Sequence, residues 1–442
     1  MLLAQKIRIF PTHEQEKVLW DLAEKCRLIY NFALKERIDA WKQNKNRSEE
    51  EKHYINYTEQ QNNLPYLKAK YPEYRWVYSK VLQMTLRKLD DAYKSFFTKW
   101  KKGDTTARPP KFKGKKYFTT LCYNQSGFKI KKDKIKFSHK HPSKTPLEFG
   151  LIYPFRYENK NIKQVELFLD SQNHWFIAIN YEHSLPKYKD NGLYQAIDLG
   201  ISNLISAVNL DFKFIQVKNR RADLYWRKKI EEVQSKRDHC KKNSHRWYRY
   251  SKKLNIMRRK CAHQMRDYQH KISKKIISNT KANTNIIGDL GVKKMAKKKK
   301  GTGSSLKNKM NRTLNHSIHN TGSLGRFAEF LTYKAKLVGK RVIRTDESYT
   351  SQDCCLCEKR VKRKLSERTI NCDCGNRMDR DSNSAVNIMV RFLHNKHEFD
   401  FLSHQPSLNE ESFLTRLDLL RYTALSTLNT GDRGLVVKAK NL

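Results

Sequence analysis

Two short apolar runs lie one after the other in "YQAIDLGISNLISAV", residues 194–208, and they decide the fold of this chain. Short apolar runs that are bounded by a turn are typical of strands buried inside a sheet. Asp198 ends the first run and Gly200 follows it, so the carboxylate is expected to project beside exposed backbone. The stretch therefore predicts two adjacent buried strands with an acidic group at the end of the first.

A second acidic group stands in "DRDSNSAVNI", residues 379–388. Asp379 and Asp381 fall at the predicted start of a helix, where free backbone N–H groups and the helix dipole favour an ionised carboxylate. A single aspartate in such a place is usually a cap. The acidic residues become a site only if the fold brings them together with Asp198, which spacing alone does not show.

The cysteines are clustered in a way that predicts a metal site. "CCLC" at 354–357 and "CDCG" at 372–375 supply two pairs, and thiolates at two turns can close a tetrahedral Zn²⁺ site that is structural rather than catalytic. Cys355 could replace Cys354 if the first turn shifts. We assign the ligands as Cys354, Cys357, Cys372 and Cys374.

The remainder of the chain alternates between helical and β-type segments. Thr12 and Gln15 have the spacing of a capping box, so a helix is expected to start there. Residues 293–312 read as a mobile loop, and residues 395–442 as a tail that is either disordered or a small appendage. The other predicted elements are a strand at 3–10, a helix at 80–100, strands within 117–183, basic helices without an obvious break at 220–280, a helix at 323–338 and a strand at 340–345.

The chain carries a large positive charge. Its 442 residues include 91 Lys and Arg against 44 Asp and Glu, a formal net charge of +47. Such an excess repels itself unless a polyanion neutralises it, so nucleic acid is the expected partner and a merely solvated basic surface the alternative. No stretch approaches the roughly 20 apolar residues that a membrane span needs. We therefore expect no membrane partner and a cytoplasmic location.

Nine segments in order resemble the TnpB family, the RNA-guided nucleases of insertion sequences that are related to type V CRISPR effectors. The resemblance covers about residues 5–392 and leaves only the tail uncovered. The segments are "FPTHEQ", "CRLIYNFAL", "VLQMTLRKLDDAYKSFF", "PKFKGKK", "AIDLGISNL", "DLGVKKM", "LTYKAKLVGKRV", "YTSQDCCLC" and "CDCGNRMDRDSNSAVNI".

The resemblance implies a multidomain α/β protein, nucleoid-associated in a prokaryote. It implies a wedge-like β-barrel, an inserted helical recognition region, an RNase H-like RuvC nuclease domain and a zinc-ribbon insert that binds target nucleic acid. The expected boundaries are 1–11 and 101–188 for the barrel, 12–100 for the recognition region, 189–349 and 379–394 for RuvC, 350–378 for the ribbon and 395–442 for the tail.

The function implied by the resemblance is cleavage of double-stranded DNA next to a short transposon-adjacent motif, directed by a noncoding guide RNA. The RuvC reaction uses two Mg²⁺ ions held by closely spaced carboxylates. Asp198 would match the first RuvC carboxylate and Asp381 the last. Asp379 would then be a support or a cap.

The third RuvC carboxylate is missing from its usual place. In "NTNIIGDLGVKKMAK", residues 283–297, the position of the family's glutamate holds Gly288. Asp289 is adjacent, but alternate residues of a strand face opposite sides, so it should point away from the place that position 288 faces.

We assign Glu329 as the relocated glutamate. It stands 41 residues after Gly288, and related proteins resemble this arrangement, with the glutamate about forty residues downstream. Gly322 and Gly325 lie on the same helical face and would clear space around it. A solvated glutamate is the plain alternative, and Glu347 is a more distant candidate for the third carboxylate.

Three functions remain open on these residues. The first is an active RNA-guided DNA endonuclease encoded by a transposable element. The second is a nuclease-dead RNA-guided DNA-binding regulator, because Gly288 breaks the usual motif. The third is a miniature type V CRISPR effector, which has the same chemistry and a different source of guide. Retention of Asp198 and Asp381 favours an active enzyme.

Overall fold

A computed structural model of the protein describes residues 1–131, 133–155, 161–289, 324–363, 367–402 and 436–438. The chain divides into two compact units, Met1–Ser184 and Leu185–Leu442. The predicted loop at 293–312 and most of the tail at 395–442 lie outside the described residues. Within the described residues, the helices are too short or too polar to cross a membrane.

The helices of the first unit begin with the predicted capping box. The Thr12 hydroxyl accepts from the Gln15 backbone N–H, and the Gln15 side chain accepts from the Thr12 N–H, so α1 starts at the expected place. The helical segments are α1 (His13–Asn44), α2 (Tyr57–Asn62), α3 (Leu64–Lys70), a 3₁₀ turn (Pro72–Trp76) and α4 (Ser79–Lys101).

The strands of the first unit form two sheets rather than a closed barrel. The four-stranded sheet has the order β1-β7-β6-β2 and the three-stranded sheet the order β3-β4-β5, and neither is hydrogen-bonded to the other in the described strands. Apolar residues of both sheets share one core with α1 and α4. The expected wedge-like barrel is therefore corrected to an open arrangement of sheets and helices. The strands are β1 (Leu2–Arg8), β2 (Leu121–Asn124), β3 (Phe128–Lys131), β4 (Lys134–Phe137), β5 (Leu147–Gly150), β6 (Ile162–Leu169) and β7 (Trp175–Glu182).

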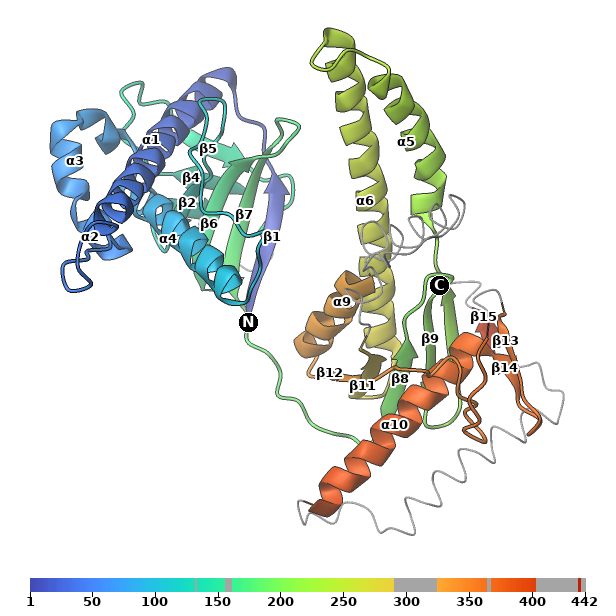
Figure 1. Cartoon of the computed structure of the whole chain (residues 1–442). Helices are drawn as coiled ribbons and strands as arrows, with labels where there is room; N and C mark the ends of the chain where they lie inside the picture. Colours follow the sequence, from blue (N-terminus) through green and yellow to red (C-terminus); the bar gives the residue numbers. More distant parts are fainter. Residues whose placement is uncertain (132, 156–160, 290–323, 364–366, 403–435, 439–442) are drawn as a thin grey trace. The chain divides into compact units, whose positions relative to one another are not determined.

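The second unit is built on a sheet of order β12-β11-β8-β9-β10-β15 (Figure 1). The quoted stretch 194–208 forms its central antiparallel pair, β8 and β9, as predicted. Strands β11 and β12 extend the sheet in parallel on the side of β8, and β15 pairs in parallel with β10. The strands are β8 (Tyr194–Asp198), β9 (Asn203–Asn209), β10 (Phe214–Lys218), β11 (Thr284–Gly288), β12 (Arg341–Thr345) and β15 (Val436–Lys438).

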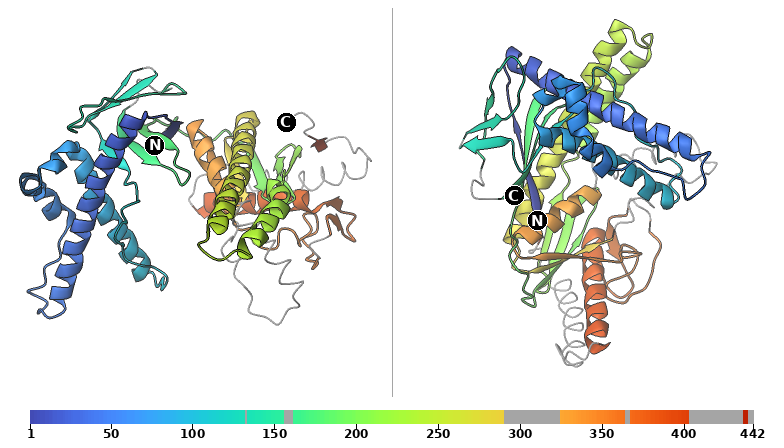
Figure 2. Two further views of the ribbon diagram at one scale, coloured as in Figure 1. Left: turned by 90° about the horizontal axis from the view of Figure 1, so that it is seen from above. Right: turned by 90° about the vertical axis from the view of Figure 1, so that its left-hand side faces the viewer.

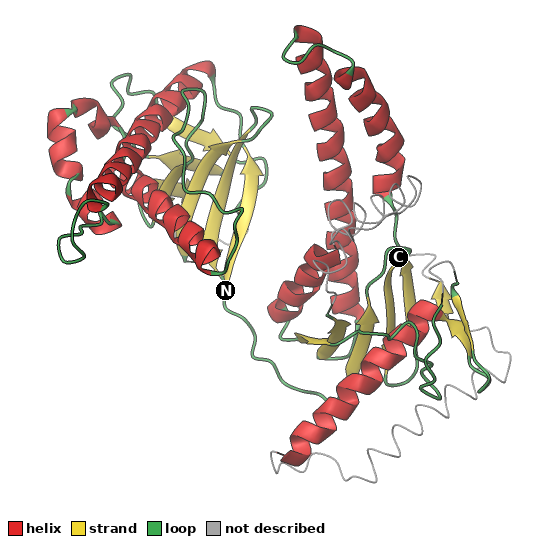
Figure 3. Ribbon diagram, viewed as in Figure 1, coloured by secondary structure: helices red, strands yellow, loops and turns green. Residues whose placement is uncertain are grey.

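Helices cover both faces of this sheet (Figures 1 and 3). Helices α6 (His245–Asn279) and α9 (Leu324–Leu337) pack on the face that carries Ile197 and Ile287. Helix α10 (Arg380–Leu402) packs on the opposite face, which carries Ala196 and Ile286. The alternation of side chains along β8 and β11 produces these two cores, one on each side of the sheet.

The basic segment 220–280 is a hairpin of two helices rather than an unbroken run. Helix α5 (Ala222–Asp238) ends before a turn in which Asn243 has a φ of 66°, and the Ser244 side chain then caps α6 by accepting from the Trp247 N–H. Figure 2 shows the two helices lying side by side. A small antiparallel ribbon of β13 (Thr369–Asn371) and β14 (Arg377–Asp379) precedes α10.

Candidate metal centres: a carboxylate cluster and a four-cysteine group

Asp198 and Asp381 meet at one end of the central sheet. Asp198 is the last residue of β8, and Asp381 lies in the first turn of α10, which covers that face. The turn after β8 is tight: a Cβ on Gly200 would lie 2.7 Å from the Asn203 carbonyl oxygen and 4.0 Å from Oδ2 of Asp381. The two aspartates predicted from the sequence are therefore brought together.

Glu347 fills the space left by Gly288. Strands β11 and β12 are parallel, and Gly288 at the end of β11 pairs with Thr345 at the end of β12. Glu347 follows Thr345 by two residues and lies against Gly288. A Cβ built on Gly288 would lie 2.2 Å from a carboxylate oxygen of Glu347 and 2.8 Å from its Cβ. Glu347 thus occupies the place where a side chain at position 288 would begin.

The three carboxylates interact electrostatically. Burial and the charges of Asp381 and Glu347 raise the pKa of Asp198 to about 8, and the charge of Arg380 opposes them. Burial and the charges of Asp289 and Asp346 raise the pKa of Glu347 to about 7. Crowded carboxylates of this kind resist ionising together unless a cation shares their charge. The donor set therefore fits a divalent cation such as Mg²⁺.

Glu329 is not brought to this cluster. Its helix, α9, packs on the Ile197 side of the sheet, whereas Asp198 alternates with Ile197 and faces α10. The Glu329 side chain is exposed beside Arg326. A Cβ on Gly325 would meet no atom within 4 Å, so the described chain makes no close approach there. In the structure, therefore, Glu329 does not lie next to Asp198.

The other two acidic residues weighed from the sequence have structural partners. Asp289 is exposed and its Oδ1 pairs with Arg344 at 3.3 Å. Asp379 caps α10, because its Oδ1 accepts from the backbone N–H groups of Asp381 and Ser382 at 3.0 and 3.2 Å. The prediction of Asp379 as a cap agrees with this geometry.

Cationic side chains surround Asp381. Asn203 donates to Oδ2 at 3.0 Å, and Nη1 of Arg368, from the base of the ribbon, lies 3.5 Å from the same oxygen. Nε of Arg380 lies 3.7 Å from Oδ1. Arg368 also donates to the Ser202 hydroxyl. Two guanidinium groups thus stand beside the carboxylates, within reach of an anionic group bound there.

The four predicted cysteines form one compact group. Their sulfur atoms all lie within 4.8 Å of one another, with Cys354 and Cys374 at 3.6 Å and Cys357 and Cys372 at 3.5 Å. Tetrahedral Zn²⁺ with bonds of about 2.3 Å needs sulfur separations of about 3.8 Å, so the group fits zinc. Among the residues that the structure describes, this is the one cluster so tight.

The polarity around Cys354 supports a thiolate. Burial acts to raise its pKa, but hydrogen bonds from the Asn376 side chain and the Cys357 and Leu356 backbone outweigh it and lower the pKa to about 7. The neighbouring Cys355 is different: burial raises the pKa of its thiol to about 12. Its sulfur lies 3.6 Å from that of Met378, away from the four-cysteine group. Cys355 is therefore a core residue here.

The fold and these two clusters define a class: a mixed α/β protein with acidic groups at the strand ends of its central sheet and a thiolate ribbon inserted before the last helix. Residues 176–299 match the OrfB_IS605 family, described as "Probable transposase". Residues 1–46 match its "Helix-turn-helix domain", and residues 325–388 match "Cas12f1-like, TNB domain". The chain is thus similar to insertion-sequence OrfB proteins over residues 1–46 and 176–299, and to the Cas12f1-like TNB domain over residues 325–388.

Individual proteins are similar to this chain over most of its length. The chain is 25% identical over 395 residues to a "Putative RNA-guided DNA endonuclease" of Streptomyces pristinaespiralis, covering 88% of this chain and 89% of that protein. It is 27% identical over 405 residues to "Putative RNA-guided DNA endonuclease InsQ" of Escherichia coli K12, covering 88% and 92%. The Cas12f1 chain of a cryo-EM complex with sgRNA and target DNA has a similar fold, with a TM-score of 0.54, 12% identity and coverage of 88% and 98%.

Proposed function

We propose that this protein is an RNA-guided DNA endonuclease of a transposable element, and that Asp198, Asp381 and Glu347 form its nuclease site. The observation that carries the proposal is the position of Glu347, whose carboxylate occupies the space left by Gly288 beside Asp198. The names of both relatives support the same activity. Glu347 takes the place that the sequence alone assigned to Glu329.

Two Mg²⁺ ions held by the three carboxylates would polarise the scissile phosphate and lower the pKa of an attacking water. Asp198 is held at the end of strand β8 and Asp381 in the first turn of helix α10. Arg368 and Arg380 lie beside Asp381. When a cation binds the carboxylates, these two guanidinium groups would stabilise the negative charge of the phosphate.

The remaining regions have supporting roles in this proposal. The open sheets and helices of the first unit correspond to the wedge region, 1–11 and 101–188, and to the recognition region, 12–100. RuvC would comprise 189–349 and 379–394, with a zinc ribbon at 350–378. The α5–α6 hairpin carries 18 Lys and Arg against 5 Asp and Glu over residues 222–279, which suits contact with a nucleic-acid backbone.

The function is tested with the full chain purified together with its co-expressed RNA. We expect Asp198→Asn and Glu347→Gln to lower Mg²⁺-dependent DNA cleavage by at least about 100-fold while DNA binding is retained. Glu329→Gln and Asp289→Asn are matched controls, because each removes one exposed carboxylate, and both should cleave normally.

Two results would contradict the proposal. Normal cleavage by Glu347→Gln together with loss in Glu329→Gln would return the third carboxylate to helix α9. Absence of cleavage by the wild type, with RNA-dependent DNA binding intact, would favour the nuclease-dead regulator. A miniature CRISPR effector would pass the same tests, and the DNA that neighbours the gene would distinguish it, through a transposon end or a repeat array.

A further inference from the structure

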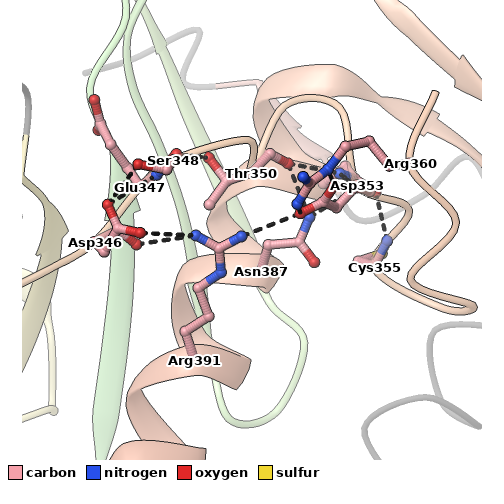
Figure 4. A network of polar contacts seen from close by, with 10 residues as sticks. Asp346, Glu347, Ser348, Thr350, Asp353, Cys355, Arg360, Asn387 and Arg391 are labelled. Atoms are coloured by element: carbon pink, nitrogen blue, oxygen red, sulfur yellow. Dashed lines mark hydrogen bonds and ion pairs between the residues drawn. The ribbon is translucent and has the colours of Figure 1, made fainter. Parts of the chain in front are cut away.

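A polar network runs from the Glu347 loop to Asp353 and Cys355, the residues on either side of Cys354 (Figure 4). Residues 346–355 run from the end of β12 to the first cysteine pair and lie along α10. Asn383, Asn387 and Arg391 are spaced four residues apart on α10, so they project from one side of the helix. All three contact this segment, as the distances below show.

The two asparagines hold the middle of the segment. Nδ2 of Asn387 donates to the carbonyl oxygens of Thr350 and Asp353 at 2.8 and 2.9 Å, and Nδ2 of Asn383 donates to the same two oxygens at 3.1 and 2.8 Å. Thr350 in turn contacts the backbone of Glu347, because its N–H and its hydroxyl both donate to the Glu347 carbonyl oxygen, at 3.2 and 3.0 Å. Thr350 therefore links the two asparagines of α10 to the backbone of Glu347.

Arg391 binds both Asp346 and Asp353, which lie near the two ends of the 346–355 segment. One of its nitrogens, Nη2, lies 3.1 Å from a carboxylate oxygen of Asp353. The other, Nη1, donates to the Asp346 carbonyl oxygen at 3.3 Å and lies 3.7 Å from the Asp346 carboxylate. A planar guanidinium can hold both partners at once, which a lysine cannot do with the same geometry. The residue that precedes Glu347 is therefore tied to the residue that precedes Cys354.

The same network reaches the sulfur atoms. Oδ1 of Asn383 accepts from the Cys355 N–H at 3.0 Å and from Nδ2 of Asn376 at 3.3 Å. Nδ2 of Asn376 also lies 3.2 Å from the Cys354 sulfur. A continuous set of hydrogen bonds therefore runs from a cysteine of the ribbon, through α10, to the backbone of Glu347.

We propose that Asn387 and Arg391 are positioning residues for Glu347, and that metal held by the cysteines sets the affinity of the carboxylate cluster through them. The inference rests on the proposed function in taking Glu347 as a ligand of the divalent cation. Outer partners that orient a ligand typically change metal affinity by about 10- to 100-fold when they are removed. The ribbon would then act on the nuclease site in addition to any contact with nucleic acid.

The test measures Mn²⁺ binding by calorimetry to the zinc-loaded full chain without nucleic acid. We expect Arg391→Gln and Asn387→Ala each to raise the Mn²⁺ dissociation constant about tenfold, with the zinc content unchanged. Arg391→Lys should raise the Mn²⁺ dissociation constant by a smaller factor. Lys359→Gln is the control, because it removes a cation of the ribbon that pairs with Asp373 and leaves the network intact.

Cleavage supplies a second measurement that separates positioning from general damage. In Arg391→Gln the Mg²⁺ concentration for half-maximal cleavage should rise by a similar factor, and the rate at saturating Mg²⁺ should return close to the wild-type rate. Cys357→Ser, which opens the cysteine group, should weaken Mn²⁺ binding in the same direction. An Arg391 or Asn387 variant that is merely destabilised would lose maximal rate or zinc instead.

The outcomes for the two proposals can be told apart. If Glu347→Gln weakens Mn²⁺ binding but Arg391→Gln and Asn387→Ala bind it as the wild type does, the positioning role is overturned and the nuclease site stands. If Glu347→Gln itself binds Mn²⁺ normally, the assignment of the third carboxylate fails.

Discussion

At the scale of single residues, the site depends on a glycine as much as on its acids. Gly288 leaves room at the end of β11, and Glu347 occupies that room from the neighbouring strand's loop. The sequence places Asp198 and Asp381 because a strand end and a helix start are local patterns. The partner of Gly288 depends on the parallel pairing of β11 with β12, which no local pattern contains.

Gly288→Ala tests this packing. The added methyl group would overlap the Glu347 side chain, so the carboxylate must move and Mg²⁺-dependent cleavage should fall by about tenfold or more. Gly325→Ala is the control, since a methyl group there meets open space. In a Glu347→Gly background, Gly288→Glu should restore part of the activity. Full cleavage by Gly288→Ala would show that Glu347 does not need its present position.

The raised pKa of Asp198 predicts a pH dependence of stability. Because the folded-state pKa of about 8 lies above the ordinary value of 3.8, the unfolded chain loses this proton first as pH rises. The contribution of Asp198 is therefore complete below about pH 4 and is lost progressively up to pH 8. Glu347 acts in the same direction, with a pKa of about 7.

The measurement is the melting temperature of the metal-free protein between pH 5 and 8. Stability of the second unit should fall across this range in the wild type, and the fall should be smaller in Asp198→Asn. Glu329→Gln, which removes an exposed acid of α9, should keep the wild-type slope. If the melting temperature of Asp198→Asn falls with pH as steeply as that of the wild type, the Asp198 carboxyl ionises normally in the folded protein.

At the scale of elements, local patterns predict most helices and strands but not their partners. The capping box starts α1 as expected, and the predicted strands 194–208 and 340–345 are present. The apolar stripe of α4 continues into Phe97 and Trp100, which are exposed because the core ends before them. The stripe of α9 shows which side of that helix is buried. It cannot show which face of the sheet the helix covers, and the prediction for Glu329 depends on that face.

The hairpin of α5 and α6 permits a prediction about nucleic-acid binding. Arg249, Lys253 and Lys260 lie on the side of α6 opposite its buried residues. We expect replacement of all three with glutamine to reduce the salt dependence of binding to a 30-nucleotide single-stranded RNA. The slope of log K against log [KCl] should become shallower by about 2, since each lost phosphate contact removes about 0.7 from it.

The control changes charge on the same hairpin in the other direction. Glu231→Gln combined with Glu232→Gln should leave the salt slope unchanged or make it steeper, because no cation is lost. The measurement is fluorescence anisotropy over a range of KCl concentrations. An unchanged slope in the triple variant would remove this face of α6 from the nucleic-acid interface.

At the scale of the whole molecule, each unit has its own core. Among the described residues, the buried apolar side chains of Met1–Ser184 form one cluster, and those of Leu185–Leu442 form two clusters on either side of the central sheet. Separate cores of this kind are expected to unfold separately. The three clustered carboxylates and the four clustered cysteines belong to the second unit, so metal should stabilise only that unit.

Calorimetry of the full chain should therefore show two unfolding transitions. Removal of zinc with a chelator should lower one of them, since a closed four-thiolate site contributes its binding energy to folding. The other transition should stay within about 1 °C. A single transition that shifts as a whole would indicate that the two units unfold together.

The pairing of Gly288 with Glu347 has a consequence for how such a site can change over evolutionary time. A chain with side chains at both positions must displace the Glu347 carboxylate, since a Cβ at position 288 would overlap it. A chain with a carboxylate at neither position has two acids where the proposed site uses three. Exchange between the two arrangements must pass through one of these impaired states, so the two kinds of site should persist as separate lineages, and neither position is informative without the other.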